Sequence, residues 1–358
     1  TWTEYNGQDD IQTNWPNNPI AYGTKGTYTI EGKTYNYKYS VNMSDHNNEI
    51  GMYNTHVYAY DETGNFAKLS LGDIYFARPW TDFAATSYAG GNGTESSPYE
   101  IATAQQLALL AKQSRTDSLE GKYFKQTAPI DLENKATKDS KYVWYMWDGI
   151  GVNSYLFSGN YDGGYNSIKN IKMNLTSTAE TSAVGLFNRT GFANISNIIM
   201  NGGSIKAIVA SDVGTIVGCA AISTRDKRTY ISNCIVENMK IKGLANTEYS
   251  MGGIAGSWVG EIRDCIVKDS VIEGSYVCGI TGYNHFDDSV VNCSVLNTSV
   301  TGTGTTKIIA RILERLAFSY GYGNVNGESI KMMYGDSTAW EGWTYNSAIN
   351  NGYPIQKS

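Results

Sequence analysis

The sequence predicts an all-β protein whose larger part is a solenoid of parallel β strands. Three observations lead to this prediction: short apolar segments recur from about residue 150, glycine and asparagine separate them, and one segment carries a clear helix signature. Glycine accounts for 38 of the 358 residues and proline for only 6, which is typical of short strands joined by tight turns and argues against collagen or generic disorder. Hydrophobic residues, at 41%, suffice for a buried core.

The charge balance excludes several partner classes. The chain has 28 Lys+Arg and 34 Asp+Glu, a formal net charge of −6, and only 17% charged residues. Because no Lys/Arg cluster occurs along the chain, nucleic acid and anionic membranes are not expected as main partners. The longest apolar stretch, 213–222, is about half of the ~20 residues that span a bilayer, so no transmembrane segment is expected. The chain starts at Thr1 without methionine, which is compatible with a signal or lipid anchor before it.

Residues 1–90 are expected to form a small antiparallel β domain. Residues 28–30 and 34–39 indicate a hairpin, because the tyrosines of the second segment alternate onto one strand face. Two further strands are expected at 57–60 and 69–76. The glycine-rich segment 90–98 breaks the pattern, and the domain boundary is placed there.

The second domain, 91–358, begins with a capping segment over about 91–147 that contains the clearest helix, at 103–114. Thr103 can accept from first-turn N–H groups, and Gln106 can reach back to the cap. Leu107, Leu110 and Ala111 share one face of this helix. We expect the helix to cover one end of the solenoid, since both open ends need covering.

Two short pieces recur out of phase and define the coils, which are expected over about 148–335 with a C-terminal cap at about 336–358. An Ile-x-Asn/Asp piece starts at residues 168, 195, 231, 262 and 290. A small-apolar-apolar piece occupies 185–188, 215–218, 253–256 and 279–282. A repeat of this size without a helix cannot bury its apolar face alone, so copies stack and each adds one strand to each of two or three parallel sheets.

Successive copies of the first piece are expected to stack their side chains. One column forms an asparagine ladder whose amides satisfy one another at a bend, and consists of Asn170, Asn197, Asn233, Asp264 and Asn292. The next column points inward and holds Ile171, Ile198, Cys234, Cys265 and Cys293, which indicates buried structural thiols. Five cysteines without a C-x-x-C pair fit neither a disulfide framework nor a zinc site.

Two segments depart from the regular repeat. The longest insertion, 220–230, carries several charges and is expected to stand out into solvent. Residues 307–318 have helical spacing but also align as a further coil, with alanine in place of the repeat glycine. A coil is favoured, and a short helix that closes the solenoid is the alternative.

These motifs resemble the GLUG-motif repeats of bacterial surface proteins. The resemblance rests on 185–187 and 253–256, each followed by an Ile-x-Asn/Asp piece, and on the segments that precede the repeats, namely 93–101, the capped helix, 121–125, 130–132 and 157–163. It covers roughly 91–355, including the ending at 352–355. It implies a right-handed parallel β-helix exported to the surface of a Bacteroides-type bacterium, in a family regarded as adhesins. Residues 1–90 resemble the small β-sandwiches of fimbrillin-like lipoproteins in expected architecture, without a shared motif, which implies an outer-membrane anchor.

Catalytic motifs of the common classes do not occur: there is no H-E-x-x-H, no G-x-S-x-G and no P-loop. The most reactive-looking segment, 284–288, places His285 beside Asp287 and Asp288, which could act as acid and base or hold Ca²⁺. A solvated loop is the plainer interpretation. No catalytic residue, metal site or cofactor is therefore expected.

Aromatic residues provide the binding hypothesis. Trp144, Tyr145 and Trp147 precede the coils, and Trp340 and Trp343 follow them, where they could stack on sugars or on a partner protein. Packing against the ends of the solenoid is the alternative. The sequence therefore predicts a non-enzymatic cell-surface adhesion or binding protein that presents a β-helix face to glycans or host-cell proteins. A carbohydrate-active β-helix enzyme (polysaccharide lyase or hydrolase) and a structural spacer are the alternatives.

Overall fold

The structure, a computed structural model, describes residues 24–30, 33–38, 51–60, 66–76, 78–133, 135–138, 141–175, 182–207, 212–221, 228–243, 250–257, 259–283, 289–304, 306–307, 316–317, 319–334, 343–344 and 355–356. The chain divides into two compact units, one of Thr1–Ala77 with Tyr142–Trp144 and one of Arg78–Lys141 with Tyr145–Ser358. Residues 78–90, which the sequence pattern grouped with the first domain, thus belong to the larger unit.

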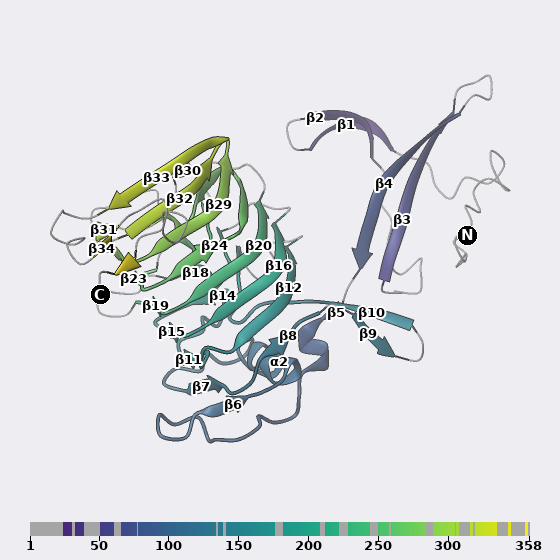
Figure 1. Cartoon of the computed structure of the whole chain (residues 1–358). Helices are drawn as coiled ribbons and strands as arrows, with labels where there is room; N and C mark the ends of the chain where they lie inside the picture. Colours follow the sequence, from purple (N-terminus) through teal and green to yellow (C-terminus); the bar gives the residue numbers. More distant parts are fainter. Residues whose placement is uncertain are drawn as a thin grey trace. The chain divides into compact units, whose positions relative to one another are not determined.

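The smaller unit contains two antiparallel hairpins (Figure 1). Strand β1 (Thr24–Ile30) pairs with β2 (Lys33–Lys38) and sets Ile30 opposite Lys33, where the hairpin was expected. Strand β3 (Gly51–Tyr60) pairs with β4 (Phe66–Phe76), and their register shifts between Thr55 and His56. Two antiparallel pairs fit the predicted β character of this part of the chain.

The larger unit begins with the expected capped helix. It opens with β5 (Arg78–Pro79), the 3₁₀ turn η2 (Trp80–Phe83), β6 (Tyr99–Ile101) and the helix α2 (Ala104–Gln113). The Gln106 backbone N–H donates to Thr103 Oγ1 at 3.2 Å, and the Gln106 side chain accepts from the Ala102 N–H at 2.8 Å. Leu107, Leu110 and Ala111 are fully buried. Figure 1 places α2 beside β6, β7 and β8, so the predicted cap at this end of the solenoid is confirmed.

Four further short strands connect the helix to the coils, namely β7 (Tyr123–Gln126), β8 (Ile130–Asp131), β9 (Lys135–Lys138) and β10 (Lys141–Met146). Strand β7 pairs with β6 at the end of one of the two largest sheets, and β8 is the first strand of the other. Strand β10 instead pairs with β5, which sets Tyr145 opposite Arg78 and Met146 opposite Pro79. This pairing brings together two aromatic segments that are distant in the sequence.

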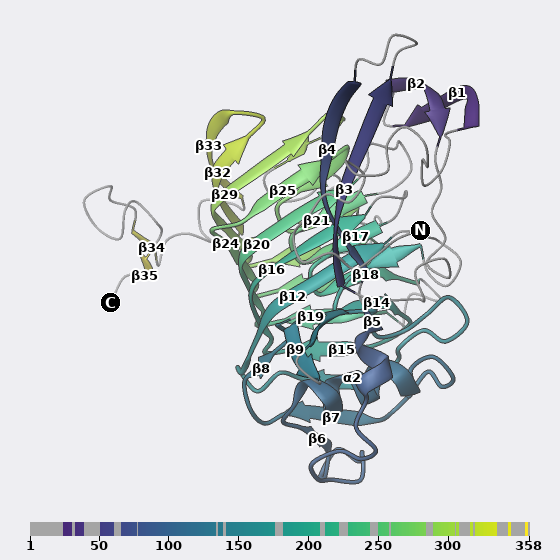
Figure 2. The same ribbon diagram turned by 90° about the vertical axis from the view of Figure 1, so that its right-hand side faces the viewer.

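The remaining strands build a parallel β-helix, as predicted. Sheet 1 contains β6, β7, β11 (Asn160–Asp162), β15 (Asn194–Ser196), β19 (Tyr230–Ser232), β23 (Glu261–Arg263), β28 (Ser289–Val291) and β31 (Leu316–Ala317). Sheet 2 contains β8, β12 (Ser167–Leu175), β16 (Ile199–Ala207), β20 (Ile235–Gly243), β24 (Ile266–Lys268) with β25 (Val271–Gly274), β29 (Ser294–Gly302) and β32 (Ser319–Val325). Figures 1 and 2 show these strands following one another in successive coils.

Each coil returns through two further strands, which form separate ladders. Sheet 3 contains β13 (Ala183–Val184), β17 (Asp212–Gly214), β21 (Ser250–Gly252), β26 (Tyr276–Cys278) and β30 (Thr306–Lys307). Sheet 4 contains β14 (Phe187–Thr190), β18 (Val217–Ala220), β22 (Ala255–Ser257) and β27 (Thr281–Tyr283). Each small-apolar-apolar repeat spans the two residues between a strand of sheet 3 and a strand of sheet 4 and the first two residues of the sheet 4 strand. The coil thus has four ladders where two or three were expected.

The C-terminal part adds antiparallel pairs. Strand β33 (Glu328–Tyr334) folds back on β32 and forms the last strand of sheet 2, and β34 (Trp343–Thr344) pairs with β35 (Ile355–Gln356). Strands β30 and β31 flank residues 308–315, which lie outside the described residues, and both continue parallel ladders. The pairing of these flanks agrees with a further coil. No helix in the described part of the chain is long and apolar enough to cross a membrane.

One copy of the predicted repeat is displaced. Ile195, Ile231, Ile262 and Val290 are in register along sheet 1, but their partner in the first coil is Tyr161. The predicted first copy, 168–171, lies in sheet 2 instead, where Ile168 faces Met200. The physical reason is that both copies contain a left-handed asparagine: φ is 57° at Asn170, within β12, and 58° at Asn197, directly after β15. Two different positions in the coil therefore look alike in sequence.

Candidate functional site

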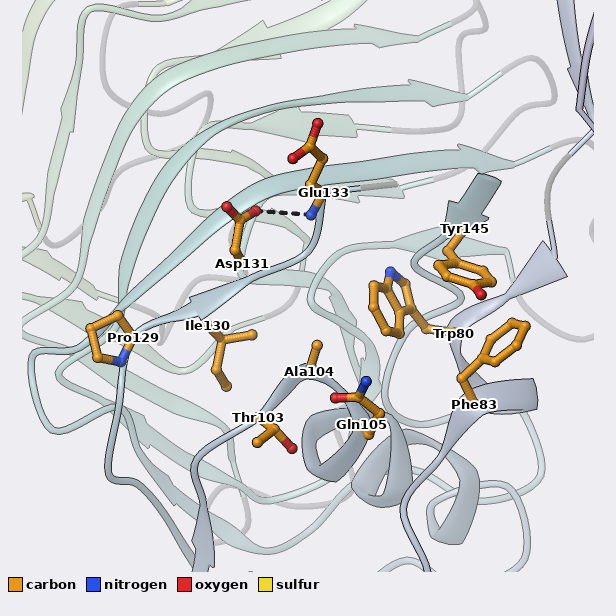
Figure 3. A pocket seen from close by; sticks show the side chains of 10 residues that line it. All are labelled: Trp80, Phe83, Thr103, Ala104, Gln105, Pro129, Ile130, Asp131, Glu133 and Tyr145. Carbon is orange, nitrogen blue, oxygen red and sulfur yellow. Dashed lines mark hydrogen bonds between the residues drawn. The ribbon is translucent and has the colours of Figure 1, made fainter. Parts of the chain in front are cut away.

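A pocket of about 500 Å³ opens where η2, α2, β8 and β10 meet (Figure 3). Its ten lining residues are Trp80, Phe83, Thr103, Ala104, Gln105, Pro129, Ile130, Asp131, Glu133 and Tyr145. All belong to the larger unit. Figure 3 shows the three aromatic side chains on one side of the pocket and the two carboxylates on another.

The aromatic side is a packed cluster of Trp80, Phe83 and Tyr145. The Tyr145 ring centroid lies 4.9 Å from that of Trp80 and 4.0 Å from that of Phe83. Trp80 and Tyr145 are each only 6% exposed, whereas Phe83 is half-buried, so Phe83 is the most accessible ring of this side. The β5–β10 pairing positions this cluster, because it aligns Tyr145 with the residues just before η2.

A half-buried carboxylate fixes the η2 turn. Asp148 Oδ2 accepts from Thr81 Oγ1 and from an Arg115 Nη2, each at 2.6 Å. The Arg115 and Asp148 side chains are 25% and 18% exposed, which makes this ion pair stronger than an exposed one. At the outer edge, Arg78 lies 4.7 Å from the Phe83 ring centroid and pairs with Asp82 at 2.8 Å. The aromatic side is therefore preorganised.

The opposite side is acidic and exposed. Asp131 Oδ1 accepts from the Glu133 backbone N–H and from Asn170 Nδ2, both at 2.9 Å, which orients the Asp131 carboxylate. The Glu133 side chain and Gln105, from the first turn of α2, are also exposed. No lysine or arginine is among the ten lining residues. The pocket therefore offers hydrogen-bond acceptors opposite apolar ring surface.

The predicted aromatic residues have different positions. Tyr145 lines the pocket, whereas Trp147 is 3% exposed and donates from Nε1 to the Leu186 carbonyl at 3.0 Å, so it packs inside the first coil. Trp340 and the side chains of Trp144 and Trp343 lie outside the described residues. Trp80 and Phe83 escaped the sequence-based prediction, because their segment was assigned to the first domain. The signal that the sequence offered for them is two aromatic residues three positions apart, directly after Pro79.

The weak catalytic candidates His285, Asp287 and Asp288 lie in 284–288, outside the described residues. Within the described residues, no three His, Cys, Asp or Glu side chains gather into a group that could hold a metal ion.

The asparagine ladder occupies one corner of the coil. Asn197, Asn233, Asp264 and Asn292 directly follow in-register strands of sheet 1 and share a left-handed backbone, with φ between 51° and 58°. Asn197 Nδ2 donates to Asp162 Oδ1 at 2.7 Å, and Asn292 Nδ2 donates to Asp264 Oδ1. These contacts and the shared φ give the four residues a structural role.

A second ladder runs along sheet 2 and was not predicted. Its left-handed members are Asn170, Gly202, Asn238, Asp269 and Asn297. Asn170 thus belongs here, which corrects its assignment to the first ladder. The missed signal is a constant offset, because four members of the second ladder follow the first-ladder residue of their coil by five positions.

The cysteines lie inside the coils. Cys234, Cys265 and Cys293 stack in the column begun by Ile198, whereas Ile171 faces Gly203 in sheet 2, so its assignment to this column was wrong. All five cysteines are free and buried. Burial raises the pKa of the Cys265 and Cys293 thiols well above the ordinary value.

A second polar cluster lies between sheets 3 and 4. Asp212 accepts from the Ser250 backbone N–H at 3.0 Å, and burial raises its pKa above the ordinary value. Burial, together with the nearby Asp212 carboxylate, raises the pKa of Cys219 to about 11. A thiol with so high a pKa is a poor nucleophile at neutral pH. This cluster therefore does not resemble an activated cysteine site.

Comparisons with known proteins give limited likenesses. No protein-family model matches the chain. Over 178 residues the chain is 26% identical to halomucin of Haloquadratum walsbyi; the match covers 48% of this chain and 2% of halomucin, so the chain spans a very small part of that protein's length. A solved structure of a proposed immunoglobulin A1 protease from Bacteroides ovatus aligns with a TM-score of 0.47 and 19% identity, over 75% of this chain and 95% of that chain.

Proposed function

We propose that this chain is a non-enzymatic carbohydrate-binding module of a bacterial cell-surface protein. The observation that carries the proposal is the pocket, in which preorganised aromatic rings face two carboxylates and an amide. A sugar ring has apolar C–H faces that pack on aromatic rings, and hydroxyl groups that donate to carboxylates. Aromatic surface with convergent polar groups is the usual composition of a small-molecule site.

The location at a cell surface belongs to the same proposal. It is supported by the GLUG-like repeats, which resemble those of exported bacterial adhesins. On this proposal the chain is secreted or held at the outer membrane and its partner is a glycan, free or carried by a host-cell protein.

Binding to a panel of glycans tests the proposal, with the exposed residues Glu133 and Gln105 as probes. We expect Glu133→Gln and Gln105→Ala to weaken binding of a recognised glycan at least tenfold, because each removes a polar contact without disturbing the core. Glu120→Gln, an exposed change outside the pocket lining, is the matched control and should bind as the parent does.

Two results would refute the proposal. One is failure of the parent protein to bind any glycan of the panel, which would leave the spacer alternative. The other is unchanged affinity in both pocket variants. Release of reducing ends or unsaturated products from a bound polysaccharide would show instead that the chain is a carbohydrate-active enzyme.

A further inference from the structure

The outward face of sheet 2 gathers lysines that are far apart in sequence. Strands β12, β16 and β20 pair in register, so that Lys172, Ser204 and Lys240 form one column and Asn174, Lys206 and Lys242 form the next. The residues between these columns, Met173, Ile205 and Ile241, are buried, which directs both columns to the outside. Together with Lys169, these lysines make up what we call the lysine face.

The lysine face is strongly positive although the chain is negative. The row of Lys169, Asn201 and Glu237 is in register across the same three strands, and with the two columns it makes nine positions. Five of the nine are lysine and one is glutamate, a net charge of +4. The whole chain has a net charge of −6. Glu237 is itself paired with Lys268 of the next coil at 2.7 Å. Folding therefore creates a basic surface that no local stretch of sequence reveals.

Two of these lysines are direct neighbours. Lys206 and Lys242 are Cα partners in adjacent parallel strands, which lie ~4.8 Å apart. Like charges placed directly opposite each other destabilise a sheet. Glu273 of the next coil lies 3.4 Å from Lys242 and offsets part of this repulsion. The Lys242 and Glu273 side chains are well exposed, at 70% and 45%, so this ion pair is weak. An anion that spans the lysine columns would remove the repulsion that remains.

We propose that the lysine face binds an extended acidic polysaccharide that lies along the coil axis. Its positive charges are all lysine, without an arginine or an aromatic residue at the nine positions, whereas nucleic-acid surfaces use arginine and stacking aromatics. Asn174, Asn201 and Ser204 lie among the lysines and can bond sugar hydroxyls. The lysine face adjoins the acidic pocket at Lys169, the Cα partner of Asp131, whereas Lys206, Lys240 and Lys242 lie on later strands of sheet 2. The carboxylates of the pocket disfavour an anionic ligand inside the pocket itself.

Binding to defined polyanions tests this inference. The probes are heparin as a sulfated chain, polygalacturonate as a carboxylated chain, dextran as a neutral chain and single-stranded DNA. We expect binding to at least one acidic polysaccharide, none to dextran, and affinity that falls steeply between 50 and 200 mM salt, because counterions are released on binding. The sulfated and carboxylated arms show which anionic group is preferred.

The decisive variant is Lys206→Gln/Lys240→Gln/Lys242→Gln. It should lower the affinity for the acidic chain at least tenfold at 100 mM salt and flatten the salt dependence. The matched control, Lys112→Gln/Lys122→Gln/Lys125→Gln, removes three exposed lysines outside the lysine face and should change affinity less than twofold. Equal losses in the two variants, or tighter binding to DNA than to either acidic chain, would overturn the inference. Glu133→Gln should leave this binding unchanged, which separates its outcome from that of the pocket.

Discussion

The left-handed asparagine at the end of a sheet 1 strand combines a backbone property with a side-chain contact. Asn197 has φ 58°, and its amide donates to Asp162 Oδ1 at 2.7 Å. The same carboxylate oxygen accepts from the Gly164 backbone N–H at 2.9 Å. Glycine tolerates this backbone without a side chain, and alanine supplies neither property.

Replacing Asn197 separates these two contributions. Asn197→Ala should lower the free energy of unfolding by about 2 kcal/mol, because it adds left-handed strain and removes a hydrogen bond to a carboxylate. Asn197→Gly should cost about 1 kcal/mol, since only the hydrogen bond is lost. Urea denaturation gives both values. If glycine proves as costly as alanine, the corner does not depend on its backbone conformation.

Glycine has a separate task at the level of the elements, where sheets 3 and 4 meet. A Cβ atom on Gly218 of β18 would lie 2.6 Å from the Val184 backbone nitrogen of β13. The in-register Gly256 and Gly282 meet backbone nitrogens of β17 and β21 at 2.6 and 2.4 Å. Strands of the two sheets therefore approach backbone to backbone in successive coils, which explains the glycines of the second repeat.

Gly218→Ala should accordingly destabilise the β-helix by about 3 kcal/mol, because the backbone atoms that the new methyl group meets must move. Gly121→Ala is an informative control: Gly121 has φ 70°, but nothing lies within 4 Å of the position that an alanine methyl group would take, so only backbone strain of ~1 kcal/mol is added. Urea denaturation midpoints compare the two. A Gly121→Ala protein less stable than Gly218→Ala would contradict close approach as the cause.

Sequence periodicity was sufficient for the coils and for the helix, because each is encoded by contiguous residues. Thr103 and Gln106 cap α2 within four residues, and the Ile-x-Asn/Asp pieces mark sheet 1 from residue 195 onward. The first copy was misplaced because Asn170 and Asn197 occupy different positions in the coil with the same backbone conformation. Local pattern cannot distinguish two positions of equal backbone geometry.

The pocket and the lysine face were harder to foresee, because each joins residues from separate elements. Tyr145 was a predicted binding residue, but its partners Trp80 and Phe83 reach it only through the β5–β10 pairing. Lys206 and Lys242 are 36 positions apart and become neighbours only when the strand register is known. The length of each inter-strand loop sets that register, and uneven loops conceal it in the sequence.

At the scale of the whole molecule, the β-helix is a one-dimensional stack. Each strand of sheets 1 to 4 pairs only with the coil before and the coil after it, so stability is shared between neighbours. The ends of sheet 2 are β8, near the helix α2, and β33, which pairs on one side with β32. Interior strands such as β20 have partners on both sides.

This arrangement predicts that the effect of a destabilising substitution at the helical end declines with distance along the stack of coils. Leu110 is fully buried in α2, and Leu110→Ala should cost about 2–5 kcal/mol locally. Hydrogen exchange followed by mass spectrometry should show the largest acceleration in β6 and β7, a smaller one in β11, and none in β23, because coupling passes only through adjacent coils. Thr116→Ala, an exposed change beyond the helix, should leave all of these strands unaltered. Equal acceleration from β7 to β23 would instead show that the coils open as a single cooperative unit.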